Sequence, residues 1–136
     1  MLFRSFDLAV TRFSGRLAPS VTTASPHLGV WVMQEAYSHE VSSCGFWPGA
    51  PGIEPLFYSY AYPEPPGYAQ SSVAPAQARF DSTLGEFVLP YEAMRQSADP
   101  DSALLQFLQS TYDAAANCAH WDRAALEAAP KHGTTA

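Results

Sequence analysis

The feature that most constrains this chain is a strong start signal for a long helix at Asp99-Pro100. Aspartate is a preferred N-cap residue, and proline suits the first helical position because its missing N–H would have no partner there. Asp101 adds negative charge at the positive end of the helix dipole. A helix is predicted from Pro100 to about Asn117. Its sheet-facing side is predicted to contain Leu104, Leu108, Thr111 and Ala115, with Leu105 and Tyr112 beside them.

Short β-prone segments that end at proline or glycine come before this helix. Apolar and polar residues alternate over residues 6–13 until Gly15 breaks the run, which is typical of a half-buried strand. The other segments are assigned from residue type and from the prolines that stop them. The predictions are strands over residues 37–47, 56–62 and 85–89, a loop over 19–26 and a short helix over 91–97.

Together these elements predict an α+β fold, in which a small antiparallel or mixed sheet carries a C-terminal helix packed on one face. The length of 136 residues is typical of one domain, and 47% hydrophobic residues are enough for a packed core. We therefore expect a single domain over residues 1–127. Residues 128–136 have no apolar pattern and are expected to form a flexible tail.

Charge and hydropathy argue against two classes of partner. A formal net charge of -6 would repel the phosphates of nucleic acid. No segment approaches the roughly 20 apolar residues that span a bilayer, and the N-terminus lacks the pattern of a signal peptide. Cys44 and Cys118 have no CxxC spacing and are expected to be reduced thiols, with a disulfide between them as the alternative. We expect a cytoplasmic protein.

Several unusual segments occur together in this chain: FDLAVTRFSGR, EAYSHEVSSCGFWPG, YAYPEPPGYA, LGEFVLPYEA, ADPDSALLQFLQSTYDAAAN and WDRAALE. Their composition and order resemble the carboxy-terminal part of a bacterial family, domain of unknown function 5996, from Phe6 to about Glu127. The resemblance implies that the chain is a fragment of a longer protein whose amino-terminal half is missing. It implies no reaction, because none is assigned to the family.

The residues that could carry acid–base chemistry are His39 and Glu64, either of which is a candidate general base. A second group of side chains could line a pocket for a ring or an apolar ligand, although packing within the sheet is the favoured role of its tyrosines. The members of this group are Trp47, Tyr58, Tyr60 and Tyr62. Alternation along a strand puts the three tyrosines on one face.

No metal-ligand spacing such as HExxH and no nucleotide-binding or kinase motif is present in the sequence. Neither a metal nor a cofactor is therefore expected. Arg12 and Arg16 lie near Asp7, and we expect a structural salt bridge there, with anion binding as the alternative.

Two hypotheses of function follow from these residues. In the first, the chain is a structural or binding portion of a larger protein, and the aromatic face of its sheet packs against the missing half or a partner. In the alternative, the chain is an enzyme that acts on a small organic substrate in a pocket lined by histidine, glutamate and tyrosine. The sequence does not decide whether the chain is an enzyme, and it specifies no reaction.

The predicted fragment should expose apolar surface that a longer protein would cover, and its first strand should leave an open sheet edge. We therefore expect self-association at high protein concentration, because the charge repulsion from a net charge of -6 is screened within about 8 Å at physiological salt. Light scattering over a concentration series measures this. A strictly monomeric species that binds no hydrophobic dye would contradict the expectation.

Overall fold

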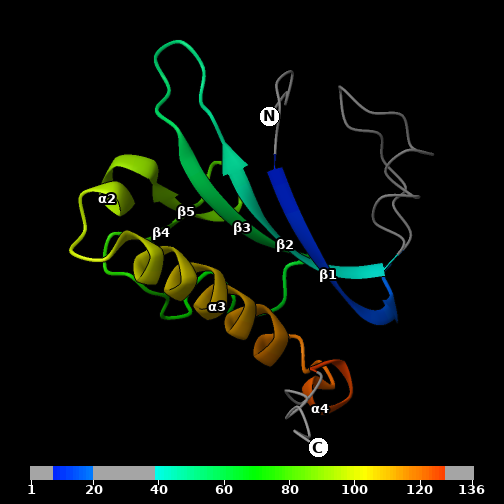
Figure 1. The fold of residues 1–136 in the computed structure, drawn as a ribbon. Coiled ribbons are helices and arrows are strands. Elements are labelled where there is room, and N and C mark those ends of the chain that lie inside the picture. Colours follow the sequence, from blue (N-terminus) through cyan, green and yellow to red (C-terminus); the bar gives the residue numbers. More distant parts are fainter. Residues whose placement is uncertain (1–7, 20–38, 128–136) are drawn as a thin grey trace, which may run out of the picture.

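The computed structural model describes residues 8–19 and 39–127 of the chain. Its strands are β1 (Leu8–Leu17), β2 (His39–Trp47), β3 (Leu56–Tyr62), β4 (Arg79–Asp81) and β5 (Glu86–Pro90). Its helices are α2 (Tyr91–Arg95), α3 (Pro100–Cys118) and α4 (Arg123–Leu126). The strands form one sheet in the order β1-β2-β3-β5-β4, and every neighbouring pair is antiparallel. Figure 1 shows α3 lying across one face of this sheet, which confirms the α+β prediction.

Three of the predicted strands occur close to their predicted positions. β3 has the predicted bounds, and β5 is displaced by one residue because Pro90 still pairs with Leu56. The described part of the second predicted strand begins at His39. The short elements β4 and α4 were not predicted, because three or four residues are too few to show a period. The loop predicted over residues 19–26 lies outside the described residues after Pro19, and the predicted tail lies wholly outside them.

The first predicted strand differs from the structure in both length and burial. β1 continues through Gly15 to Leu17, because Gly15 takes a φ of 84° and the pairing with β2 shifts register between Phe13 and Leu17. A half-buried strand was expected, but Leu8 and Val10 are 63% and 60% exposed. The reason is topological, since β1 is an edge strand and α3 covers the sheet mainly over β2 and β3.

The register of the sheet places the aromatic residues of β3 on two faces. Phe57 and Ala61 face α3 and pack against the main core, with Ser59 between them. Tyr58 and Tyr60 lie on the other face, where their ring centroids are 6.3 Å apart. The predicted alternation is therefore confirmed for Tyr58 and Tyr60, whereas Tyr62, at the end of β3, lines a pocket together with the end of α3.

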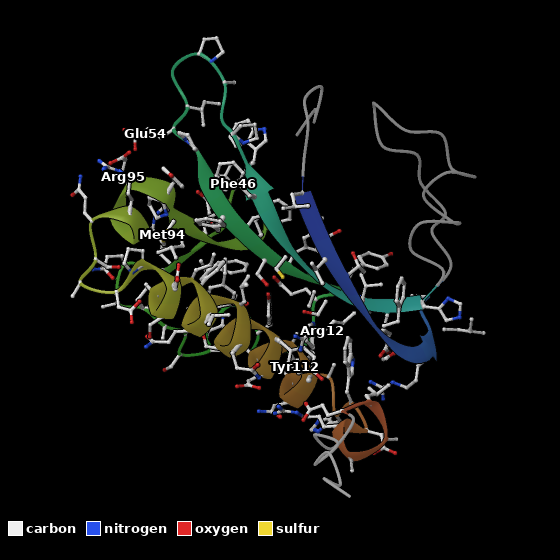
Figure 2. The ribbon with its side chains drawn as sticks, in the orientation of Figure 1. Arg12, Phe46, Glu54, Met94, Arg95 and Tyr112 are labelled. Carbon is white, nitrogen blue, oxygen red and sulfur yellow. The ribbon has the colours of Figure 1, made fainter. Side chains whose placement is uncertain are left out.

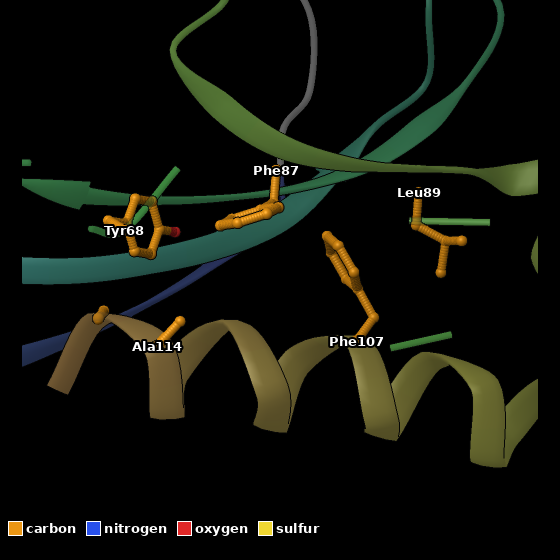
Figure 3. Close-up of a cluster of buried hydrophobic side chains, with 6 residues drawn as sticks. Tyr68, Phe87, Leu89, Phe107 and Ala114 are labelled. Carbon is orange, nitrogen blue, oxygen red and sulfur yellow. The ribbon is translucent and has the colours of Figure 1, made fainter. Parts of the chain in front are cut away.

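The core lies between the sheet and α3, and aromatic residues from three parts of the chain meet in it (Figure 3). Phe87 of β5 packs edge-on against Tyr68, with ring centroids 5.0 Å apart, and Phe107 of α3 is completely buried. Tyr68 follows β3 in a loop, and its hydroxyl donates a hydrogen bond to the Ser59 carbonyl at 3.2 Å. Burial raises the pKa of Tyr68, so the hydroxyl stays protonated and this bond persists at neutral pH.

The start of α3 is as predicted, but only the C-terminal part of its predicted buried face, Thr111, Tyr112 and Ala115, is buried. The Asp99 carboxylate accepts a hydrogen bond from the Ser102 N–H at 3.1 Å, which confirms the N-cap. The predicted face followed the leucines, yet Leu105 is 65% exposed and Leu104 and Leu108 are only partly buried. The buried stripe consists of Ala103, Phe107, Thr111, Tyr112, Ala114, Ala115 and Ala116. Alanine side chains are short, so they let the helix lie close to the sheet with Phe107 at the centre of the contact.

The buried residues of α3 predict which side-chain truncation in this helix destabilises the protein. Phe107→Ala should lower the free energy of unfolding by about 3–5 kcal/mol, because it leaves a cavity in the core. Leu105→Ala on the same helix is the matched control and should change it by less than about 0.5 kcal/mol. Urea denaturation of both variants measures the difference. Equal effects would show that the buried face of α3 is assigned incorrectly.

Candidate functional site

The chain after α3 turns sharply, and this turn positions the side chains of the candidate site. The Trp121 N–H donates to the Ala116 carbonyl at 2.8 Å, and the His120 N–H donates to the Asn117 carbonyl at 3.2 Å. These two bonds form a Schellman motif, which requires a left-handed residue after the C-cap Ala119. His120 takes that conformation with a φ of 54°, although glycine is the usual residue there.

The Schellman turn folds Trp121 back against the last turns of α3. Its indole packs on Tyr112, with ring centroids 6.2 Å apart, and belongs to a small core with Tyr112 and Ala116. Trp121 is 8% exposed, and its Nε1–H has no hydrogen-bond partner in the described part of the chain. A buried donor without an acceptor is costly and uncommon in folded proteins. Trp121 therefore combines a structural role with an unused donor.

A pocket of about 300 Å³ lies where α3 ends beneath the sheet, and we call it the α3 cleft. Tyr62 and the loop after it supply rigid apolar walls, since three prolines of that loop line the pocket. The other side is formed by the end of α3 and the turn after it. The cleft residues used below are Arg16, Glu40, Tyr62, Cys118, His120 and Trp121, together with Pro63, Pro65 and Pro66.

An ion pair lies at the edge of the α3 cleft. Arg16 Nη2 is 2.8 Å from Glu40 Oε2, and Arg16 Nε donates to the same oxygen at 2.9 Å. Arg16 also donates to the Ala119 carbonyl, so it ties β1 and β2 to the end of α3. The salt bridge expected in this region is therefore present, but the partner is Glu40; Asp7 lies outside the described residues.

Both cysteines are free thiols, which confirms the prediction of reduced cysteines. Cys118 lines the α3 cleft, and its Sγ lies 3.6 Å from Ser71 Oγ. Cys44 lies on β2, where burial raises the pKa of its thiol and the nearby Arg12 partly opposes that shift. A raised pKa disfavours the thiolate, which is the nucleophilic form. Cys44 is therefore poorly suited to nucleophilic catalysis at neutral pH.

A second pocket of about 420 Å³ lies between β1 and the two C-terminal helices, and we call it the Arg12 pocket. Its lining consists of Arg12, Phe13, Tyr112, Trp121, Leu126 and Glu127. The guanidinium carbon of Arg12 lies 4.2 Å from the centroid of the Tyr112 ring, and Figure 2 shows both residues between β1 and the C-terminal end of α3. Arg123 contacts the same ring at 5.4 Å. Tyr112 therefore interacts with two cations.

The predicted site residues do not gather in one place. His39 begins β2 opposite Leu17, and Glu64 is exposed in the loop after β3. Neither residue lines either pocket, although Glu40, Pro63 and Pro65, which are adjacent to them in the sequence, line the α3 cleft.

Of the four predicted aromatic residues, Tyr62 alone lines the α3 cleft. Trp47 and Tyr58 are buried, and Tyr60 stacks beside Tyr58.

Sequence reasoning missed most of the residues that line the two pockets. His120 and Trp121 follow the predicted helix directly, so a C-terminal turn at that helix was the signal that could have identified them. No group of three or more histidine, cysteine, aspartate or glutamate residues in the described ranges is arranged to hold a metal ion. No described helix is both long and apolar enough to span a membrane.

Comparison with known proteins gives one match. The model of a family of unknown function, DUF5996, matches residues 1–128, which is nearly the whole chain. No curated protein and no solved structure matches the chain. The match agrees with the resemblance seen in the sequence segments, and it assigns no reaction or ligand. The chain belongs to the DUF5996 family.

Proposed function

We propose that this chain is a binding module that holds a small organic molecule in the α3 cleft. The observation that carries the proposal is the composition of the cleft walls. Tyr62, Trp121 and three prolines provide apolar, rigid surface, while Arg16, Glu40 and His120 provide a few polar groups. Pockets for small ligands characteristically combine apolar walls with a small number of convergent polar groups.

The backbone of His120 gives independent support for a binding role. A non-glycine residue with a φ of 54° costs about 1 kcal/mol relative to glycine, and strained residues of this kind concentrate at ligand sites. Glycine would satisfy the Schellman turn without strain. The imidazole at this position is therefore explained better by a contact in the cleft than by the needs of the turn.

The geometry favours binding over catalysis. The Glu40 carboxylate is held by two donors of Arg16, so it is not positioned as an unpaired base. An enzyme is the second candidate, because His120, Glu40 and Tyr62 are the three residue types expected for such a pocket. In that case His120 would be the general base.

Contact with another protein chain is a further role that one observation favours. β1 is an edge strand, and four of its large apolar residues are more than half exposed: Leu8, Val10, Phe13 and Leu17. Edge strands with apolar side chains tend to pair with other chains. This supports self-association or packing against a missing part of a larger protein.

The setting of the protein is also part of the proposal. We infer a bacterial, cytoplasmic protein in which this chain forms the carboxy-terminal part of a longer architecture. Free Cys44 and Cys118 support a reducing compartment. The order of the sequence segments supports the position within the family.

The proposal predicts that a ligand can be found by its effect on stability. A screen of small organic molecules by thermal shift should yield compounds that raise the melting temperature, because a ligand at about 100 times its Kd adds about 2.7 kcal/mol to the stability of the native state. Tyr62→Ala should lower the affinity for such a ligand about tenfold or more. Tyr60→Ala on the same strand is the control and should retain the affinity, since Tyr60 does not line the cleft. Ligands insensitive to Tyr62→Ala would contradict the assignment.

The strained turn predicts opposite effects on stability and binding. His120→Gly should raise the free energy of unfolding by up to about 1 kcal/mol, because glycine takes a positive φ without steric cost. The same variant should lower the affinity for the ligand that the thermal-shift screen finds for the α3 cleft. Ala119→Gly is the matched control, and it should lower stability, since Ala119 has a φ of -87°. Urea denaturation measures both effects, and a destabilised His120→Gly would show that the imidazole stabilises the fold instead.

A further inference from the structure

Arg12 differs from the other arginines of the described residues in having an aromatic ring, and not a carboxylate, as its close contact. Within residues 8–19 and 39–127, every other arginine pairs with a carboxylate at 3.2 Å or less. Arg12 makes no hydrogen bond or ion pair in those ranges, and its contact is the face of the Tyr112 ring at 4.2 Å. Stacking uses the face of a guanidinium and leaves the N–H groups at its edge available.

The carboxylate that shares the pocket with Arg12, Glu127, is hydrogen-bonded to other residues, and Arg123 also holds Asp113. Glu127 Oε1 accepts from Arg123 Nε at 2.6 Å and from the Tyr112 hydroxyl at 3.1 Å. Asp113 Oδ1 accepts from Arg123 Nη2 at 2.7 Å. Arg123 therefore forms ion pairs with both acids, whereas Arg12 interacts with Glu127 only through its charge and makes no hydrogen bond or ion pair within the described residues.

Trp121, which lines the same pocket, carries a second unused donor. Trp121 is 8% exposed, and its Nε1–H has no acceptor in the described part of the chain. Trp121 and Arg12 both contact Tyr112, one by its ring edge and the other over its face. Two donors that approach one aromatic ring from different elements could be satisfied by a single anion.

We propose that the Arg12 pocket binds the carboxylate of a small apolar organic acid. The planar edge of Arg12 matches a carboxylate, and Trp121 adds an N–H donor. Phe13 and Leu126 supply apolar walls for the body of the acid, in a volume of about 420 Å³ that suits a small ligand. Glu127 in the wall and the net charge of -6 favour a monoanion over a more highly charged phosphate. This site differs from the α3 cleft in being lined by Arg12, although Trp121 lines both pockets, so the Arg12 variants are what distinguish the two sites.

Phenylacetate and its neutral analogue 2-phenylacetamide are matched probes of the site. In ¹H–¹⁵N spectra of the full chain, phenylacetate should shift the indole N–H signal of Trp121 in a saturable way, with Trp121→Phe used to identify that signal. The amide should bind at least about tenfold more weakly, because a charge-assisted bond to arginine is lost. Arg12→Gln should lower the affinity for phenylacetate by at least about tenfold for the same reason.

Arg79→Gln is the control for net charge, since Arg79 is an exposed guanidinium on β4 at the opposite edge of the sheet. It should change the affinity for phenylacetate less than twofold. Arg12→Lys keeps the charge but loses the planar fork, so it should also weaken binding, and it replaces Arg12→Gln if that variant does not fold. Equal affinities for the acid and the amide, no saturable shift, or unchanged binding in the Arg12 variants would each overturn the proposal.

Discussion

The close contact between α3 and the sheet is the constraint on which the rest of the structure depends. Alanines on the buried face of α3 bring the helix near the strands, and Phe107 fills the space against Phe87 and Leu89 (Figure 3). This contact sets the position of the last turn of α3 relative to β1, β2 and β3. The α3 cleft and the Arg12 pocket both lie at that end. The positions of their lining residues therefore depend on the packing around Phe107, which lies more than one helical turn earlier in α3.

Tyr112 and Trp121 link this packing to the polar groups of the two pockets. Tyr112 faces the small core with its ring and donates its hydroxyl to Glu127, while Arg12 and Arg123 lie over the ring. Burial is the main cause of the raised pKa of Tyr112, and the hydrogen bond to Glu127 acts in the same direction. The tyrosine therefore stays protonated at neutral pH, and it can keep donating to Glu127. One neutral ring thus orders two guanidinium groups without neutralising either of them.

Much of the fold could be predicted from the sequence, because helix caps and strand alternation depend on residues that are close together in the chain. The N-cap at Asp99, the strand over residues 56–62 and the alternation of its tyrosines all follow from residues within one element. The buried face of α3 could not be predicted from the leucines. Phe107 and the alanines of α3 pack against the sheet, so Leu105 is left exposed. Which side chains fit between the helix and the sheet depends on core residues that are distant in the sequence.

The candidate site was harder to predict than the fold for a similar reason. His39 and Glu64 were chosen for their chemistry, yet neither lines a pocket; the residues beside them in the sequence, Glu40, Pro63 and Pro65, line the α3 cleft instead. Arg16, Glu40 and His120 come together only because the end of α3 meets the strands, a contact that no local pattern encodes. Tyr62 was identified because it stands at the end of a clear strand beside a proline-rich loop.

Net charge and local charge lead to different conclusions about partners. A surplus of acidic residues argues against long polyanions, because many phosphates would meet a repulsive surface. That argument does not extend to a single small anion, whose binding depends on donors within a few ångströms. In the Arg12 pocket the carboxylate of Glu127 is already paired with Arg123, so its repulsion of an anion is locally balanced. The arrangement of arginines around Tyr112 therefore says more about small anions than the total charge of the chain does.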